Sequence, residues 1–191
     1  MRRLPLALVL PILALPGPGR AQQPDRDGGK LVVRQGGQVV GQEEFSIERV
    51  RGGLNLIVTA SYPPADTNRV IASFGARRIT VRLASDGTEV AREYPGGART
   101  LVVAEHALSL YVVAGGLAPG PVTVRGQSGA GTSGTLEGGG REPLPGRVDT
   151  QARRMTLHAG SELVELWYDD AGRLLRIAIP GKDLTAERAQ P

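Results

Sequence analysis

Most of this chain consists of short runs in which apolar and polar residues alternate, each closed by glycine or proline. In residues 44–48, for example, Phe45 and Ile47 alternate with acidic and hydroxyl side chains. A period of two is typical of a strand that buries one face. The predicted strands cover residues 30–34, 38–50, 54–60, 68–74, 78–84, 88–94, 100–103, 122–124, 153–158, 162–168, 173–179 and 184–188.

Only residues 105–114 have helical spacing, with Leu108, Tyr111 and Val112 on one side. Many short strands and one helix favour an all-antiparallel architecture over alternating strand–helix units. We therefore predict a mainly β fold: a single strongly curved antiparallel sheet, or incomplete barrel, with one short helix. Residues 30–191 are expected to form this one domain. The chain has no cysteine, so its apolar core must hold it together without disulfides.

Two turn regions stand out for their glycine content. Asp169–Gly172 predicts a hairpin between the last two long strands, with Gly172 suited to a left-handed position. Residues 115–140 contain ten glycines, which by themselves fix no compact core. We expect this segment to be a mobile loop or a long hairpin arm.

The first 21 residues read as a signal peptide. Arg2 and Arg3 precede an apolar run at residues 4–15, and small residues at 19 and 21 suit a cleavage site. The apolar run is too short to cross a bilayer, and no later run is long enough to do so. We therefore predict a periplasmic or secreted protein without a membrane span after cleavage, and a flexible arm at residues 22–29.

Charge argues against a nucleic-acid partner. The formal net charge is +4, but Arg2, Arg3 and Arg20 would leave with the signal peptide, and the remaining basic residues exceed the acidic ones by only one. Nucleic-acid binding needs a concentrated basic patch, whereas these arginines are scattered.

The strongest indication of an enzyme is Ser128 within residues 126–130, followed by Asp149 and His158. This order resembles that of serine hydrolases of the α/β type. The glycine-rich residues 131–134, however, do not predict the helix on which that nucleophile turn depends. We therefore expect a non-enzymatic protein and keep a hydrolase using Ser128 as the lesser alternative.

The sequence offers no set of metal ligands. His106 and His158 are the only imidazoles, and their acidic neighbours lack ligand spacing. Asp169 and Asp170 suit a turn better than a calcium loop. We expect no metal and no cofactor.

Two strands, 54–60 and 173–179, are apolar on both faces, so each should meet a second apolar partner beyond the core: another sheet, a protein or a lipid-like ligand. We expect Trp167 to face the interior near Leu163, Leu175 and Ile177, and Tyr168 to lie outside or in a second layer. The candidate ligand-lining residues are Phe45, Tyr111, Trp167, Leu175 and Ile177.

Two motifs carry a resemblance to known proteins. Residues 37–47 place Gly-x-Glu before an aromatic-led strand, and residues 166–176 form a Trp-Tyr-Asp-Asp-Ala-Gly-Arg hairpin that ends at Pro180. They resemble the opening and closing segments of bacterial exported domain-of-unknown-function families. Such families are similar in shape to periplasmic lipoprotein carriers, which implies a curved sheet with a hydrophobic concavity and no known reaction.

Together these patterns predict an exported envelope protein that binds an apolar, lipid-like ligand or an envelope protein partner in a curved β-sheet. A structural component of a surface assembly is the main alternative.

Overall fold

The computed structural model describes residues 25–189 except 65–66, 86, 105 and 127. The predicted signal peptide at 1–21 lies outside the described residues.

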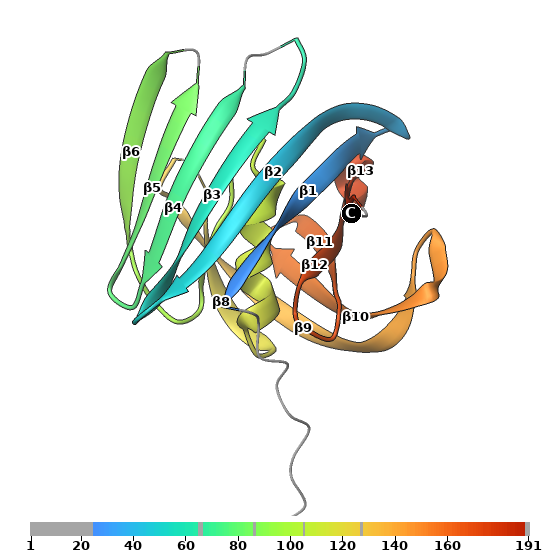
Figure 1. The fold of residues 1–191 in the computed structure, drawn as a ribbon. Coiled ribbons are helices and arrows are strands. Elements are labelled where there is room, and N and C mark those ends of the chain that lie inside the picture. The colour runs from blue at the N-terminus through green and yellow to red at the C-terminus, as the bar shows by residue number, and fades with distance from the viewer. Residues whose placement is uncertain (1–24, 65–66, 86, 105, 127, 190–191) are drawn as a thin grey trace, which may run out of the picture.

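One sheet contains all thirteen strands of the described chain, in the order β6-β5-β4-β3-β2-β1-β13-β12-β11-β10-β9-β8-β7. Neighbours are antiparallel except β7 and β8. The sheet curls round without closing, so the predicted incomplete barrel with one short helix is confirmed (Figure 1). The strands are β1 (Arg26–Gln35), β2 (Gln38–Val50), β3 (Gly53–Ser61), β4 (Asn68–Gly75), β5 (Arg78–Ser85), β6 (Thr88–Pro95), β7 (Thr100–Val102), β8 (Gly120–Arg125), β9 (Gly131–Leu144), β10 (Arg147–Ala159), β11 (Glu162–Tyr168), β12 (Leu174–Ile179) and β13 (Leu184–Arg188).

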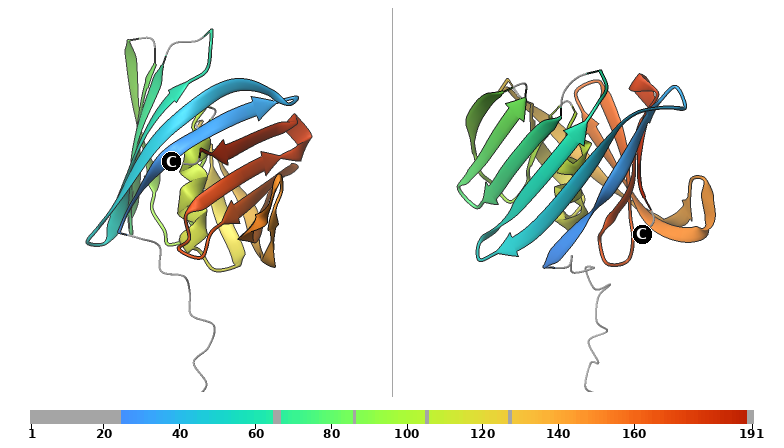
Figure 2. Two further views of the ribbon diagram at one scale, coloured as in Figure 1. Left: turned by 45° about the vertical axis from the view of Figure 1, so that its right-hand side comes forward. Right: turned by 45° about the horizontal axis from the view of Figure 1, so that its top comes forward.

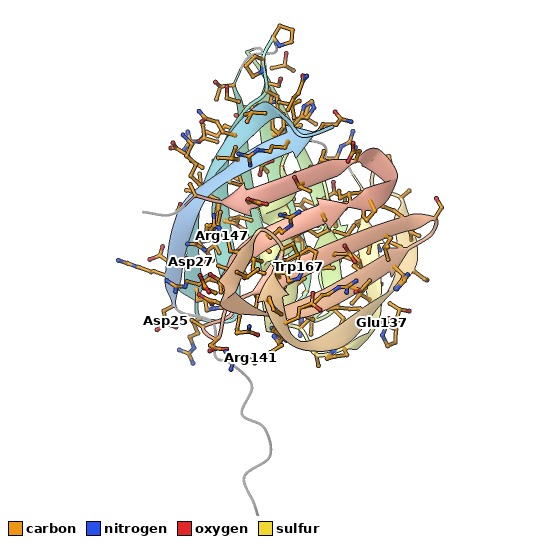
Figure 3. All side chains as sticks on the ribbon, turned by 90° about the vertical axis from the view of Figure 1, so that its right-hand side faces the viewer. Asp25, Asp27, Glu137, Arg141, Arg147 and Trp167 are labelled. Atoms are coloured by element: carbon orange, nitrogen blue, oxygen red, sulfur yellow. The ribbon has the colours of Figure 1, made fainter. Side chains whose placement is uncertain are left out.

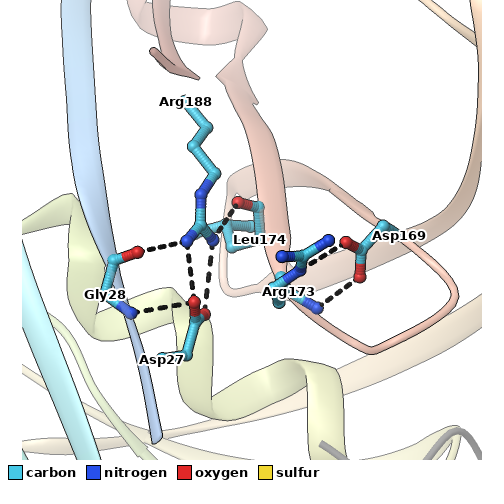
Figure 4. Close-up of polar contacts among 6 residues, drawn as sticks. All are labelled: Asp27, Gly28, Asp169, Arg173, Leu174 and Arg188. Atoms are coloured by element: carbon cyan, nitrogen blue, oxygen red, sulfur yellow. Dashed lines mark hydrogen bonds and ion pairs between the residues drawn. The ribbon is translucent and has the colours of Figure 1, made fainter. Parts of the chain in front are cut away.

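The first and last strands meet in the middle of the sheet, because β1 pairs with both β2 and β13. Strand β1 begins at Arg26, so residues 26–29 form strand where a flexible arm was predicted. Two contacts explain the correction. Asp27 forms an ion pair with Arg188 at 2.7 Å (Figure 4). A Cβ at Gly29 would come within 2.9 Å of the Arg188 side chain, so glycine leaves room for the guanidinium in this position.

The glycine-rich segment is built largely of strands. Of its two predicted forms, the long hairpin is the one present. Strand β9 pairs along β10, and we call this β9–β10 hairpin the hairpin arm. Close approach explains two of its glycines. A Cβ at Gly134 would lie 2.7 Å from the carbonyl oxygen of His158, and one at Gly138 would lie 2.6 Å from the Pro119 ring.

The helix lies inside the curled sheet, where it fills much of the concavity (Figure 2). It is a 3₁₀ helix, η1 (Leu108–Gly116), and begins three residues later than predicted. Most of its side chains are buried in the main core, so it presents no polar face to solvent.

Opposite walls of the sheet hold the two ends of η1. At its first turn, Glu43 of β2 accepts hydrogen bonds from the backbone N–H groups of Leu108 and Ser109, at 2.8 and 2.7 Å. At its last turn, Arg153 of β10 donates to the carbonyl of Gly115 at 2.9 Å. The anion therefore lies at the positive end of the helix dipole and the cation at the negative end, which stabilises both.

Trp167 and Tyr168 lie on the faces opposite to those predicted. Tyr168 is fully buried in the main core and donates to the carbonyl of Tyr111 at 2.8 Å. Trp167 lies on the outer face, in a separate cluster with Leu144, Ala152 and Ala178 (Figure 3). The hairpin arm explains the difference, because it covers Trp167 and its Glu142 accepts the indole N–H at 2.9 Å.

The hairpin arm also explains why strand β12 can be apolar on both of its faces. On β12, outer-face Ala178 and half-buried Leu175 pack against the Trp167 cluster, so the chain itself covers this face. On β3, the outer face carries Ile57, which is 38% exposed. The second face of β12 therefore needs no foreign partner.

Among the described residues, no helix is long and apolar enough to cross a membrane.

Candidate ligand-binding site

A cavity of about 700 Å³ opens at the end of the barrel where η1 begins. We call it the mouth cavity. It lies between the end of β1, the loop after β3 and the short turn η2 (Pro180–Lys182). Its lining combines aliphatic side chains with a few polar ones: Gln35, Val40, Tyr62, Pro63, Pro64, Val103, Ala104, His106, Leu108, Tyr111, Gly126, Glu162, Ile179, Lys182 and Leu184.

A β-bulge brings Val40 into this lining. The pairing of β1 with β2 passes from Val33–Gly41 to Arg34–Val39, which leaves Val40 as the extra residue. Such bulges redirect a side chain that regular alternation would place elsewhere.

Tyr62 forms one wall of the mouth cavity and is fixed on three sides. Its ring lies over Gly41, where a Cβ would come within 2.4 Å of the ring. Its hydroxyl donates to Glu43 at 2.5 Å, and its ring stacks on His106 with centroids 4.4 Å apart. Burial, and then the charge of Glu43, raise the pKa of Tyr62, so the phenol remains a donor at neutral pH.

Glu43 links this wall to the helix. The carboxylate is fully buried on the inner face of β2 and also accepts from the Ser109 hydroxyl at 2.5 Å. A buried carboxylate is tolerated when its oxygens are saturated by donors, as they are here. Glu43 therefore positions both Tyr62 and the first turn of η1 at the mouth cavity.

His106 lies just before the helix with a φ of 59°, in the left-handed region that non-glycine residues rarely adopt. Its side chain is exposed apart from the stack on Tyr62. The conformation turns the chain from β7 into η1 and leaves the imidazole at the edge of the mouth cavity.

Tyr111 supplies a polar group within the mouth cavity. Burial raises its pKa, and the nearby negative charge of Glu162 adds to the effect. Within the described chain its hydroxyl makes no hydrogen bond, although it lines the cavity. The protonated phenol can therefore donate to an oxygen acceptor placed there.

The rim is polar and held by its own contacts. Lys182 forms an ion pair with Glu162 at 2.6 Å. Gln35 donates to the carbonyl of Lys182 at 3.2 Å. The rim therefore offers one cation and one anion beside an apolar interior.

The five candidate residues from the sequence do not form one site. Tyr111 lines the mouth cavity. Phe45 and Ile177 face inward but belong to the filled core, and the Arg188 guanidinium lies 5.4 Å from the Phe45 ring centroid. Trp167 and Leu175 lie on the outer face. Sequence reasoning missed Tyr62, His106 and Lys182, although the break at Tyr62-Pro63-Pro64 marked one of the loops concerned.

The residues of the hydrolase alternative have other surroundings. Ser128 lines a second cavity, whose lining includes neither Asp149 nor His158. His158 lies 3.6 Å from Glu137 on the hairpin arm. Within the described residues, no group of three or more histidine, aspartate or glutamate side chains could hold a metal ion.

Neither the family models nor the curated proteins give a match to this chain. Among solved structures, it is similar to the crystal structure of a β-barrel-like protein of the domain of unknown function DUF1849 from Brucella abortus. The two share 11% identity at a TM-score of 0.42, over 90% of this chain and 98% of the other.

Proposed function

We propose that this protein binds a small amphipathic molecule in the mouth cavity and acts as a non-enzymatic, exported protein of the cell envelope. The observation that carries the proposal is the Tyr111 side chain, which lines a cavity of mixed aliphatic and polar walls and whose hydroxyl has no hydrogen-bond partner among the described residues. A ligand that supplies an acceptor there would satisfy a donor that the described chain leaves unpaired. Export rests on the signal peptide predicted at residues 1–21.

The size and lining of the cavity indicate the ligand class. Its volume falls within the range of about 300–1,000 Å³ that small-molecule sites occupy. Val40, Leu108 and Leu184 offer contacts for an apolar body. Lys182, Glu162 and His106 in the lining suit a polar head group.

The helix limits where such a ligand can lie. Because η1 occupies the concavity, the space that an open carrier would use for its cargo is filled by Leu110, Val112 and other core residues. The proposed ligand therefore lies above the first turn of η1, and its apolar part is confined to the mouth cavity.

Binding of a fluorescent fatty acid to the purified protein, followed by native mass spectrometry, tests the proposal. We expect uptake of one molecule per chain. Val40→Trp should fill the cavity and weaken binding at least tenfold, or about 1.4 kcal/mol. Tyr111→Phe removes only the donor and should weaken binding roughly fivefold to tenfold.

Val148→Trp is the matched control, because Val148 is 76% exposed on the hairpin arm and contributes nothing to the lining. Its binding should equal that of the wild type. The proposal fails if the wild type shows no uptake, or if all three variants bind alike while remaining folded.

A further inference from the structure

The barrel has an open side, where the two edge strands β6 and β7 face a second cavity of about 270 Å³. We call this cavity the seam. Val81 and Leu83 of β5, Val90 and Tyr94 of β6, and Val102 of β7 give it a mostly apolar lining. It differs from the mouth cavity in being bordered by a long unpaired strand edge.

Strand β6 is the longer of the two edges and pairs only with β5. On an edge strand, every second residue points its N–H and C=O away from the sheet, which is the template that an added strand uses. Val90 faces the seam and is 42% exposed, so a large apolar side chain lies beside these free backbone groups.

Charge is distributed unequally over the two faces of β6. On the outer face, Glu89 and Glu93 have arginine partners on β5, at 3.9 and 3.3 Å. On the inner face, Arg92 lines the seam and has no ion pair among the described residues. Among the residues that the structure describes, no acidic side chain lines the seam, so the Arg92 guanidinium lies there among mostly apolar side chains.

We propose that the seam receives an extended segment of a partner protein, which adds to the free edge of β6. Alternate side chains of the segment would be apolar and lie against Val90 and Val102. An acidic side chain would lie opposite Arg92. Inward charges on edge strands discourage indiscriminate pairing, so Arg92 selects segments that carry the acid.

A second copy of this chain fits the edge less well. Antiparallel self-pairing centred on Ala91 would place Glu89 opposite Glu93 twice. A centre at Arg92 would oppose the two arginines, and a centre at Glu93 would oppose two glutamates. Like charges directly opposite each other destabilise a strand pair, so these three registers are disfavoured for a β6–β6 dimer, whereas a centre at Val90 opposes no like charges and is left to the test below.

A labelled peptide tests the proposal on the purified protein. The probe is an eight-residue peptide that alternates valine and threonine and carries one central glutamate. A second peptide carries lysine in place of glutamate, and a third is the acidic peptide with N-methyl groups on alternate amides. Fluorescence anisotropy should show binding of the acidic peptide, at least tenfold weaker binding of the lysine peptide, and none of the methylated one.

Arg92→Glu should reverse the preference, so that the lysine peptide binds better than the acidic one. A merely structural role for Arg92 would not produce this reversal. Arg69→Glu, on the exposed face of β4, is the matched control and should leave the wild-type preference intact. Amide exchange in β6 should slow when the acidic peptide is bound.

The proposal is overturned if the acidic peptide does not bind, or if Arg92→Glu leaves the order of the peptides unchanged. A concentration-dependent dimer that Arg92→Glu abolishes or strengthens would also overturn it, because the edge would then belong to a second copy. Binding of the fatty-acid probe to the mouth cavity is measured independently of peptide binding to the seam. Either of the two proposals can therefore fail without the other.

Discussion

The two halves of the sheet bury their side chains in different ways. In β2–β5, one face packs into the main core that contains η1 and the other is largely open to solvent, as the alternation in β2 and β3 shows. In β11 and β12, the outer face around Trp167 is covered as well, because the hairpin arm packs over this side chain (Figure 3). The second half is therefore a layered structure, whereas the first is a single sheet against a core.

Ion pairs in the second half include exposed ones, such as Arg141–Asp170, but also less exposed ones than any between β5 and β6. The Arg78–Glu93 pair in the first half is 67% and 60% exposed, and exposed pairs contribute about 0–1 kcal/mol. In the second half, Arg176 is 17% exposed, bonds to Glu187 and lies 5.7 Å from the Trp167 ring centroid. We infer that local opening begins at β6 and reaches β10–β12 last.

The largest effect is expected where the two halves are joined, at Glu43. Glu43→Ala leaves the Tyr62 and Ser109 hydroxyls and two helix N–H groups without their acceptor. Buried donors that lose a charged partner cost about 3–5 kcal/mol in total. Urea denaturation should show this loss.

Glu44→Ala is the control, since the neighbouring carboxylate lies exposed on the outer face. It should change the free energy of unfolding by no more than about 0.5 kcal/mol. A loss below about 1 kcal/mol for Glu43→Ala would show that the helix does not depend on this carboxylate.

A smaller difference in the free energy of unfolding is expected between substitutions on the outer faces of the two halves. Trp167→Ala removes a buried ring under the hairpin arm and should cost about 3 kcal/mol. Ile57→Ala removes a half-exposed side chain from the outer face of β3 and should cost about 1 kcal/mol or less. Equal losses in thermal or urea unfolding would contradict the proposed difference between the halves.

The most gradual of the expected effects is the dependence of the free energy of unfolding on alkaline pH. Burial raises the pKa values of Tyr62 and Tyr168, whereas an unfolded tyrosine titrates near pH 10. The folded state therefore keeps protons that the unfolded state loses. The free energy of unfolding is unaffected by these groups below about pH 9 and falls above pH 10, by about 1.4 kcal/mol per pH unit for each tyrosine.

Urea midpoints between pH 9 and 11.5 measure this slope. Tyr168→Phe and Tyr62→Phe should each reduce the slope of the free energy of unfolding against pH by the contribution of one tyrosine. This reduction is independent of the stability that each variant loses at pH 7. Phenolate absorbance that rises for these groups while the protein remains folded would contradict the burial argument.

Sequence patterns predicted the strands well where one face meets solvent. The bounds of β2 and β13 agree with the predicted ranges, because polar alternation and turn residues mark them; the bounds of β11 agree as well, since turns flank it. The pattern failed at Trp167 and Tyr168, where both faces are buried and hydrophobicity no longer distinguishes inside from outside. A register shift in the β11–β12 pairing lies at the same two residues.

The site was less predictable than the fold because its contacts are distant in sequence. Glu43 and Ser109 are 66 positions apart, and nothing in the local sequence of either indicates the bond. The hairpin arm was predicted only as one of two forms, because two of its glycines are explained by close approach to Pro119 and to the backbone of His158, which local sequence does not indicate. Both features depend on how the sheet curls.

The central place of β1 has a consequence for the order of folding. Leu31 opposes Arg188 across the β1–β13 pair. Strand β1 therefore cannot complete this pairing until β13, which is synthesised much later, is available. Contacts of such long sequence separation form slowly, because the intervening chain must be ordered first. During synthesis the sheet therefore remains incomplete at its middle, and only the final few residues allow it to be finished.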